Sequence, residues 1–347
     1  MLRSAAPQWA GHGVECHVLA VAPSAGPLAQ DLSVAGYPVM HEPDVPLRRV
    51  PARLRMLVSA GRYDVVHLHA ERGNFWFGLA ALSARAAAVR TVHSIFPFRG
   101  ALRAERAVQR RTLSALSVVH VAVSAAVAGN EHRRFHNRAQ VVPNWYDSSF
   151  APPTAQERAR ARAELRLSER AFVAVSVGNC AGLKRHNLVL EAMAHPRSPR
   201  GLVYLHVGQE DEEHSERHLA EELEVGDRTR FLGLRHPLQA LHAADVFVMP
   251  SVREGVGIAA IEALATGLPA VLADSPGLRD LAGNGPAVRL TDDTPEAIAC
   301  TLAAVMHDAE RGECIRRPPD AVCERFSMER GVAAYAGIYQ NLLTQRG

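Results

Sequence analysis

Short apolar runs alternate with stretches of helical spacing along most of this chain, and this alternation limits the possible folds more than any other feature. In the first half, the runs that predict strands are Val14–Val21, Val65–Leu68, Val89–Val92, Val118–Val123 and Gln140–Val142. In the second half they are Phe172–Val177, Leu202–Val207, Thr229–Phe231, Val246–Met249 and Ala270–Leu272. Strands that recur in this way with helices between them form parallel β-α-β units. The sequence therefore predicts an α/β fold.

The chain of 347 residues is too long for one ordinary core and fits two domains. The alternation pauses over residues 144–167, where Pro152-Pro153 precedes an Arg/Ala/Glu-rich helix, so we place the interdomain connection there. We expect two doubly wound, Rossmann-like domains that face a cleft, formed by residues 1–147 and 148–325. Residues 326–347 are expected to form a C-terminal helix, capped by Ser327, that packs back toward the N-terminal domain.

The N-terminal domain begins in an unusual way. Leu2–Ala10 has helical spacing and leads directly into the first predicted strand, whereas a doubly wound domain normally opens with a strand and a glycine-bearing turn. Either the start codon lies too far downstream, or the domain has lost an inner strand. We therefore expect a shortened N-terminal domain that lacks the opening strand and whose sheet is hard to complete.

Composition narrows the location of the protein and the kinds of site it holds. No run approaches the roughly 18 apolar residues that a membrane span requires, and charged or polar residues interrupt what would be a secretory signal. The cysteines are Cys16, Cys180, Cys300, Cys314 and Cys323. Their odd number and the absence of a C-x2-C pair favour reduced thiols over disulfides or a zinc site. We therefore expect a cytoplasmic protein.

The chain contains 38 arginines and a single lysine, Lys184. An ammonium group is a compact point charge that enters a crowded pocket and contacts several phosphate oxygens, whereas a guanidinium is a wide planar fork. Lys184 lies between the strand that ends at Gly178 and a helical stretch from Leu188, in the kind of loop where α/β proteins bind anions. We interpret it as a phosphate ligand. The alternative is that Lys184 has no special role and that its codon simply did not change to arginine when the composition of the chain drifted that way.

The segment from Ala244 to Asp274 predicts a buried strand, a glycine-rich turn, a helix and another strand. Gly255 and Gly257 allow the backbone to approach a ligand, and the helix that begins near Gly257 offers free N–H groups and its dipole to an anion. A diphosphate bound there would also face Lys184. Glu262, about one turn into the helix, is placed to accept hydrogen bonds from a ribose diol, and Glu254 to address what lies beyond the phosphates.

The residues from Pro250 to Pro269 follow the pattern Pro-Ser-x-x-Glu-Gly-x-Gly-x-x-x-x-Glu-Ala-x-Ala-x-Gly-x-Pro. In this pattern the chain resembles the family 4 retaining glycosyltransferases of the glycosyltransferase-B fold. The resemblance extends over nearly the whole chain, through weaker motifs at Asp64-Val-Val-His-Leu-His69, Thr91-Val-His-Ser94, Val121-Ala-Val-Ser124, Val142-Pro-Asn144 and Phe231-Leu-Gly233.

The resemblance implies transfer of a sugar from a nucleotide-sugar donor, with retention at the anomeric carbon. It implies catalytic roles for His93, Lys184 and Glu254, with His93 near the sugar; the alternative for His93 is a structural histidine at a strand end. The implied donor-binding residues are Gly178, Asn179, Lys184, Arg185, Glu254, Gly255, Gly257, Ile258 and Glu262. Glu254 would contact sugar hydroxyls, Glu262 the ribose, and the Gly257-Ile258 amides with Lys184 the diphosphate.

Retention without an evident nucleophile suggests that the leaving diphosphate itself takes the acceptor proton, so catalysis depends on stabilising its charge. Lys184 and the helix N-terminus supply that stabilisation, and we expect neither a metal nor another cofactor. No Asp-x-Asp stands in a suitable loop. We interpret Glu210-Asp-Glu-Glu213 as a solvated, acidic helix start.

Three departures from the family pattern leave other functions open. One is the missing opening strand, which removes the glycine turn that normally lines the acceptor side of the cleft. Asn179 follows Gly178 where the family usually has an arginine, and Arg185 replaces that charge only by approaching from another angle. Trp145 follows Pro143-Asn144 where the family has glycine, which puts an indole near the interdomain hinge. The alternatives are a degenerate or non-glycosidic transferase, or a nucleotide-sugar-binding subunit of a partner enzyme.

Arginines concentrate in the first half of the chain, where residues 1–150 carry a net charge of +8 against −5 for residues 151–347. One predicted helix carries Arg99, Arg103, Arg106, Arg110 and Arg111. Such a face lies on an anionic membrane surface, binds an anionic or lipid-linked acceptor, or is merely solvated. Peripheral contact at the inner face of the membrane is thus one expectation. Nucleic acid is not expected as a partner, because no aromatic platform accompanies the charge.

Overall fold

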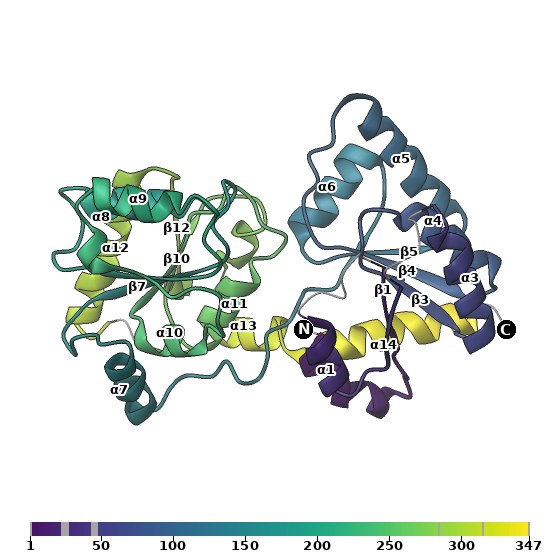
Figure 1. The fold of residues 1–347 in the computed structure, drawn as a ribbon, viewed down its shortest axis with the longest axis horizontal. Helices are drawn as coiled ribbons and strands as arrows, with labels where there is room; N and C mark the ends of the chain where they lie inside the picture. The colour runs from purple at the N-terminus through teal and green to yellow at the C-terminus, as the bar shows by residue number, and fades with distance from the viewer. Residues whose placement is uncertain (1, 22–27, 43–47, 284, 314–315, 346–347) are drawn as a thin grey trace. The chain divides into compact units, whose positions relative to one another are not determined.

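The chain folds into two compact α/β units. The computed structural model describes residues 2–21, 28–42, 48–283, 285–313 and 316–345. Unit 1 comprises Met1–Trp145 and Ser327–Gly347, and unit 2 comprises Tyr146–Phe326. The C-terminal helix therefore belongs to the same unit as the N-terminal half of the chain (Figure 1).

Unit 2 is built on one six-stranded parallel sheet. Its strands are β7 (Val173–Val177), β8 (Val203–Val207), β9 (Thr229–Phe231), β10 (Val246–Met249), β11 (Ala270–Ala273) and β12 (Val288–Thr291). Its helices are α7 (Ala155–Glu164), α8 (Asn187–Ala194), α9 (Ser215–Glu222), α10 (Leu238–Ala243), α11 (Ile258–Ala265), α12 (Pro295–Glu310) and α13 (Asp320–Arg325), with 3-10 turns at Gly226–Arg228, Arg279–Leu281 and Gly285–Ala287. The spatial order β12-β11-β10-β7-β8-β9 is that of a dinucleotide-binding Rossmann fold.

Helices cover both faces of this sheet (Figure 1). One large core joins α8, α9 and α12 to β7, β8, β10 and β11. The middle strands are buried along their whole length, which explains why they read as unbroken apolar runs in the sequence. The first helix, α7, is fixed by a capping box between Thr154 and Glu157.

Unit 1 contains two separate parallel sheets. Its strands are β1 (Val18–Ala20), β2 (Val39–His41), β3 (Val65–Leu68), β4 (Ala87–Val92), β5 (Val119–Ala122) and β6 (Gln140–Val141). Its helices are α1 (Leu2–Trp9), α2 (Leu28–Val34), α3 (Val50–Gly61), α4 (Asn74–Ser83), α5 (Gly100–Ala115), α6 (Ala125–Phe135) and α14 (Met328–Thr344), with a 3-10 turn at Ala10–His12. β1 pairs with β2, and β3 to β6 form a four-stranded sheet.

The gap between these two sheets confirms the expected incomplete sheet. Within the described residues, β1 has no strand partner besides β2, and β3 has none besides β4. In a doubly wound order, the opening strand lies between these two edges. One side-chain contact joins the segments before β3 and β1: the Tyr63 hydroxyl lies 2.6 Å from Nδ1 of His17.

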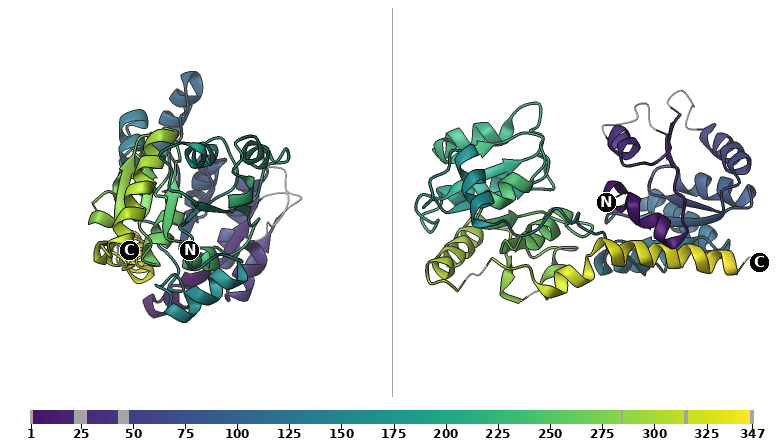
Figure 2. Two further views of the ribbon diagram at one scale, coloured as in Figure 1. Left: turned by 90° about the vertical axis from the view of Figure 1, so that its left-hand side faces the viewer. Right: turned by 90° about the horizontal axis from the view of Figure 1, so that it is seen from below.

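The C-terminal helix α14 is part of the unit 1 core. Figures 1 and 2 show α14 beside α1, and its buried side chains share one cluster with Trp9, Val89 and Val121. Ser327 caps α14 as expected, since its side chain accepts a hydrogen bond from the Arg330 amide. The helix is also tied to the sheet by the Tyr339 hydroxyl, which lies 2.7 Å from His67.

Trp145 packs tightly against this helix. Its indole is 3% exposed, and a Cβ added at Gly331 of α14 would lie 2.2 Å from the ring. Tyr335 meets the same ring edge-on at a centroid distance of 6.2 Å. The indole is therefore a core side chain of unit 1, for which the glycine at position 331 makes room.

Four sequence expectations need correction at the level of elements. The first strand covers only Val18–Ala20 of the predicted Val14–Val21, and the predicted helix ends at Trp9 before a 3-10 turn. β2 and β12 were not predicted, because both are short and neither shows an unbroken apolar run.

No helix within the described ranges is long and apolar enough to span a membrane.

Candidate functional site

The predicted site residues of unit 2 gather where the strand order reverses. β8 and β9 lie on one side of β7, whereas β11 and β12 lie beyond β10. The loops that leave the carboxyl ends of β7 and β10 therefore diverge, and open α/β sheets bind their ligands in the resulting crevice. The first loop carries Gly178, Asn179 and Lys184, and the second carries Glu254, Gly255 and Gly257.

The loop after β7 is held against the loop after β8. Gly208 approaches so closely that a Cβ there would lie 2.0 Å from the Gly178 carbonyl oxygen. The Asn179 carbonyl Oδ1 accepts a hydrogen bond of 3.0 Å from the Gln209 amide. Asn179 thus supplies no charge to the site but fixes the path of the loop that leads to Lys184.

Lys184 and Glu254 form an ion pair across the two diverging loops. Nζ of Lys184 lies 2.8 Å from Oε1 of Glu254, with side-chain exposures of 29% and 15%. The backbone supports this arrangement, because the Val252 amide donates a 3.0 Å hydrogen bond to the Leu183 carbonyl. The structure therefore brings together the two residues that the sequence placed at one edge of the sheet.

A glycine that the sequence reasoning missed positions Glu254. The Glu254 amide donates to the Pro276 carbonyl at 3.0 Å. Gly277, which follows, has a φ of 89°, and a Cβ there would lie 2.2 Å from the Glu254 carbonyl oxygen. No side chain fits this approach, so glycine at position 277 is a structural requirement of the Glu254 turn. The Ser-Pro-Gly turn after β11 was the available signal.

Helix α11 begins directly after the glycine-rich turn. Gly257 is its N-cap with a φ of 71°, and Ile258 is its first residue. The first N–H groups of a helix have no partner within it, so they point outward with the positive end of the helix dipole. Glu262 lies one turn further along, where burial raises the pKa of its carboxyl to about 7.

Arg185 is directed away from the Lys184–Glu254 pair. Its guanidinium forms an ion pair with Asp293, at the end of β12, and this contact lowers the pKa of the Asp293 carboxyl. Arg185 therefore reaches a phosphate only by exchanging this carboxylate for it. Asp293 was not predicted, because 108 residues separate it from Arg185.

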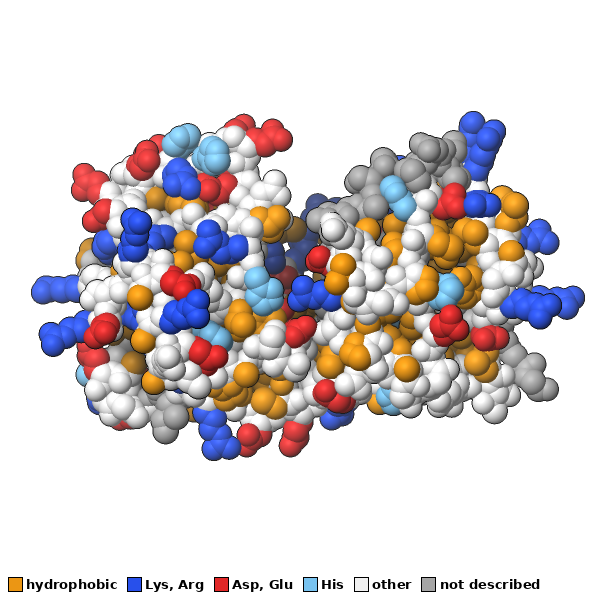
Figure 3. All heavy atoms as spheres, turned by 60° about the horizontal axis from the view of Figure 1, so that its bottom comes forward, with side chains coloured by type: hydrophobic (Ala, Val, Ile, Leu, Met, Phe, Trp, Pro, Cys, Tyr) orange, Lys and Arg blue, Asp and Glu red, His pale blue; other side chains and the backbone are white. Residues whose placement is uncertain are grey.

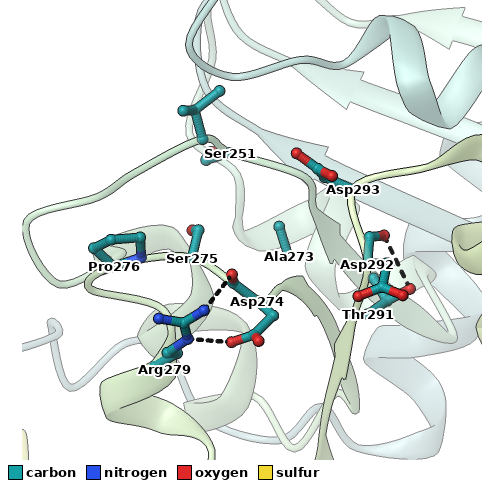
Figure 4. Close-up of a pocket in the computed structure, with 10 residues that line it drawn as sticks. Ser251, Ala273, Asp274, Ser275, Pro276, Arg279, Thr291, Asp292 and Asp293 are labelled. Carbon is teal, nitrogen blue, oxygen red and sulfur yellow. Dashed lines mark hydrogen bonds and ion pairs between the residues drawn. The ribbon is translucent and has the colours of Figure 1, made fainter.

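A pocket of ≈ 290 Å³ opens at the carboxyl ends of β10, β11 and β12 (Figure 4). Its lining residues are Ser251, Val252, Ala273, Asp274, Ser275, Pro276, Arg279, Thr291, Asp292 and Asp293. The acidic side chains are partly neutralised, since Arg279 pairs with Asp274 and Arg185 with Asp293. This pocket adjoins the turn that carries Glu254, and its lining is mostly polar.

His93 lies in unit 1, directly after β4. Its Nε2 is 2.9 Å from Nδ1 of His69, which follows the neighbouring strand β3. Burial lowers the pKa of His93, and burial together with His93 lowers that of His69 to about 4. Both imidazoles are therefore neutral near pH 7, and one of the pair donates to the other. The structure places them at the carboxyl edge of the unit 1 sheet.

The predicted basic face on α5 is smaller than expected. Arg110 is 1% exposed and forms ion pairs with Glu71 and Glu131, with its guanidinium over the Phe135 ring. Helical spacing alone did not distinguish this buried arginine from solvated ones. Arg99, Arg103 and Arg111 are exposed, and Leu102 and Val108 are exposed beside them.

Comparison with known proteins identifies the family. The model described as "Glycosyltransferase Family 4" matches residues 1–150, and the model described as "Glycosyl transferases group 1" matches residues 157–317. The chain belongs to glycosyltransferase family 4. Within this family it is similar to the D-inositol 3-phosphate glycosyltransferase of Salinispora tropica, with 28% identity over 83% of this chain and 66% of that protein. Relatives of the same name from two corynebacteria are covered over 60% and 49% of their lengths, so the chain spans about half to two thirds of these curated relatives.

Solved structures place this family 4 protein in the glycosyltransferase-B fold. A glycosyltransferase from Rickettsia africae superposes with a TM-score of 0.83 at 14% identity, over 99% of this chain and 93% of that one. Anabaena HepE in complex with UDP and glucose gives a TM-score of 0.81 at 19% identity, over 98% and 94%. At these identities the likeness concerns the fold.

Proposed function

We propose that this protein transfers a sugar from a nucleotide-sugar donor to an acceptor, with retention at the anomeric carbon, and that unit 2 binds the donor. The observation that carries the proposal is the Lys184–Glu254 ion pair at the point where the strand order of unit 2 reverses. A cation, a carboxylate and a helix N-terminus all lie on the two loops that diverge there.

The donor diphosphate replaces Glu254 as the partner of Lys184. A diphosphate offers more charge and more acceptor oxygens than one carboxylate, so it competes well for the ammonium group. The Gly257 and Ile258 amides at the start of α11 bind the same anion. Glu254 is then free to accept hydrogen bonds from the sugar hydroxyls, and Glu262 accepts those of the ribose.

Retention follows from attack on the same face of the sugar that the diphosphate leaves. In this mechanism a leaving phosphate oxygen takes the acceptor proton as the glycosidic bond breaks. Lys184 and the first amides of α11 stabilise the negative charge that builds on the diphosphate. These groups do the work that a metal ion does in other transferases, and the proposed mechanism requires no metal.

We propose a UDP-sugar as the donor, with UDP-glucose as the first candidate. Support comes from Anabaena HepE, which shares the fold and was solved with UDP and glucose and with UDP-glucose. Because the donor is a cytoplasmic metabolite and the four described cysteines are free thiols, we place the protein in the cytoplasm.

The acceptor is proposed to bind unit 1. His93 is half-buried, neutral and hydrogen-bonded to His69, so it offers a fixed polar contact to a sugar hydroxyl without adding charge. The exposed arginines of α5 favour an anionic acceptor, whether free or carried on a lipid. A phosphorylated acceptor also agrees with the name of the relatives that are called D-inositol 3-phosphate glycosyltransferases.

Peripheral contact with an anionic membrane is proposed through α5, where Arg99, Arg103 and Arg111 stand beside exposed Leu102 and Val108. Elsewhere, on the face that Figure 3 shows, basic and acidic side chains are interspersed. The full chain is expected to sediment with anionic vesicles at low salt and to be released at high salt. Replacing Arg103 with Glu should weaken this binding, and no sedimentation at low salt would remove the membrane proposal.

A thermal-shift titration with UDP-glucose and other nucleotide sugars tests donor binding. At a hundredfold excess over Kd, the donor adds about 2.7 kcal/mol to the stability of the fold, which corresponds to about 5 to 10 °C. Lys184→Ala is expected to abolish the shift, and Lys184→Arg to reduce it. Arg160→Ala, which removes an exposed cation on α7, is the control and should leave the shift intact. An unchanged shift in Lys184→Ala overturns the phosphate assignment.

One observation favours a second candidate, a donor-binding subunit without turnover of its own. Asn179 is engaged by Gln209 and Arg185 by Asp293, and Lys184 is the cation that pairs with Glu254. Single-turnover assays with donor and a panel of phosphorylated acceptors separate the two functions. Product with the donor's anomeric configuration, read by NMR, supports the retaining enzyme. Tight donor binding with neither transfer nor hydrolysis supports the binding subunit.

A further inference from the structure

A second cluster of polar side chains lies beneath the loop that leads to Lys184, and the proposed function does not use it. It comprises Cys180 from that loop, His206 from β8 and Glu216 from the first turn of α9. One potential ligand atom from each lies within 4.8 Å of the other two. Sγ of Cys180 is 2.6 Å from Oε2 of Glu216 and 4.0 Å from Nε2 of His206.

The thiol and the carboxyl group of this cluster share one proton. Burial raises the pKa of the Cys180 thiol, and Glu216 raises it further. Burial also raises the pKa of Glu216. Two anions at 2.6 Å would repel one another strongly, so the thiol donates to the carboxylate. A divalent cation in place of this proton would pair with both anions and leave the group neutral.

The two imidazoles beside this pair do not both have hydrogen-bond partners. Nε2 of His206 is 2.8 Å from the Gly178 carbonyl oxygen. His186 stacks near His206 at a centroid distance of 4.6 Å and is 1% exposed, yet neither of its ring nitrogens has a partner. Nε2 of His186 lies near the same residue, since a Cβ added at Gly178 would be 3.7 Å from it. Buried nitrogens without partners are costly, and an imidazole N–H of His186 can donate to the Gly178 carbonyl when His206 no longer does.

We propose that Cys180, His206 and Glu216 form a Zn²⁺ site. In a tetrahedral zinc site, sulfur and nitrogen ligands lie about 3.5 Å apart, as follows from Zn–S and Zn–N bonds of about 2.3 and 2.0 Å. The sulfur–nitrogen distance of 4.0 Å is close to this value. The sulfur–oxygen distance must widen by about 1 Å, which rotation of the Glu216 side chain allows.

The ligand types select the metal. Thiolate and imidazole exclude Mg²⁺ and Ca²⁺, whereas one sulfur, one nitrogen and one carboxylate oxygen suit Zn²⁺. Water takes the fourth position, and binding releases the thiol proton to solvent. Cys180 and Glu216 are both partly exposed, so the ion has a way in.

This site would join the loop after β7 to α9 and so restrain the loop that leads to Lys184. The sequence pattern predicted no zinc site, because the three ligands lie 26 and 10 residues apart on different elements and form no short motif. The proposal does not depend on sugar transfer, since it concerns only the ligands and the stability of the loop.

Cobalt binding to the full chain tests the proposal. The protein is stripped with EDTA, desalted into a buffer with a non-chelating reductant, and titrated with Co²⁺ alone. We expect one equivalent to bind with a thiolate-to-cobalt charge-transfer band, and Zn²⁺ to displace it. Cys180→Ser should remove the band, and Glu216→Gln should weaken Co²⁺ binding by at least about tenfold. Cys300→Ser, which removes another partly buried thiol of unit 2, should change neither.

The absence of a charge-transfer band in the native chain overturns the proposal. A band that survives in Cys180→Ser also overturns it, because the metal is then held by another thiol. Circular dichroism checks the fold of each variant. If Cys180→Ser does not fold, Glu216→Gln decides, since it keeps the thiol and the side-chain shape: an unchanged Co²⁺ affinity in this variant refutes the site.

Discussion

Replacing Glu262 with glutamine should change how the stability of the protein depends on pH. Burial raises the pKa of Glu262 from 4.5 to about 7, so ionising it costs about 3 kcal/mol more in the folded protein than in the unfolded chain. A carboxyl group whose pKa is raised on folding contributes fully below its unfolded pKa, and the contribution is lost as pH rises through the folded value. Between pH 5 and pH 8.5 the wild type should therefore lose about 2.5 kcal/mol relative to Glu262→Gln.

Urea denaturation of both proteins at pH 5, 6, 7 and 8.5 measures this difference, since the other titrating groups cancel in the comparison. The exposed Glu222→Gln is the control, and its difference from wild type should stay flat. The argument fails if the Glu262→Gln difference is equally flat. Donor binding adds a second measurement. In the role proposed for Glu262 the ionised carboxylate accepts hydrogen bonds from the ribose, so affinity should rise with pH through 7 in the wild type and should not rise in Glu262→Gln.

Three further substitutions test packing within the two units. Glu131→Gln removes the buried charge between two buried arginines of unit 1 and should lower the free energy of unfolding, measured by urea denaturation, by about 3 kcal/mol. The exposed Glu105→Gln is the control and should leave the free energy of unfolding almost unchanged. Gly331→Ala pushes a Cβ into the Trp145 ring and should cost about 1 to 3 kcal/mol; Gly337→Ala, in open space on the same helix, should stabilise by about 0.5 to 1 kcal/mol. Gly277→Ala should abolish the donor-induced thermal shift, since its Cβ displaces the turn that carries Glu254.

Most of the unit 2 fold could be predicted, because its strands are buried on both faces and appear as apolar runs. β12 was not predicted, because two of its four residues are only half-buried and one of them is Arg289. β2 is a three-residue strand that is nowhere fully buried. A short strand at or near the edge of a sheet has no pattern of its own, and its pairing is decided by neighbours that are distant in the sequence.

The site was predictable where it depends on strand order, and not where it depends on contacts between distant segments. Lys184 and Glu254 each follow a buried strand, so a parallel sheet brings them to one edge. The partner of Arg185 lies at the end of β12, a strand that the sequence did not show. The buried position of Arg110 depends on Glu131 of the next helix, and helical spacing within α5 contains no information about that contact.

The surroundings of Lys184 also explain why this position holds the single lysine of the chain. Its stem passes over Gly178: a Cβ there would lie 3.5 Å from Cε and 3.7 Å from Cδ of the lysine. The ammonium then reaches one oxygen of Glu254. A guanidinium has the same charge but is wider and planar, so it would have to leave the glycine surface to present its fork. The reduced thermal shift expected for Lys184→Arg follows from this geometry, since the charge is unchanged. An arginine that restored the full shift would mean that the shape of the cation does not matter, and that the lone lysine is an accident of composition.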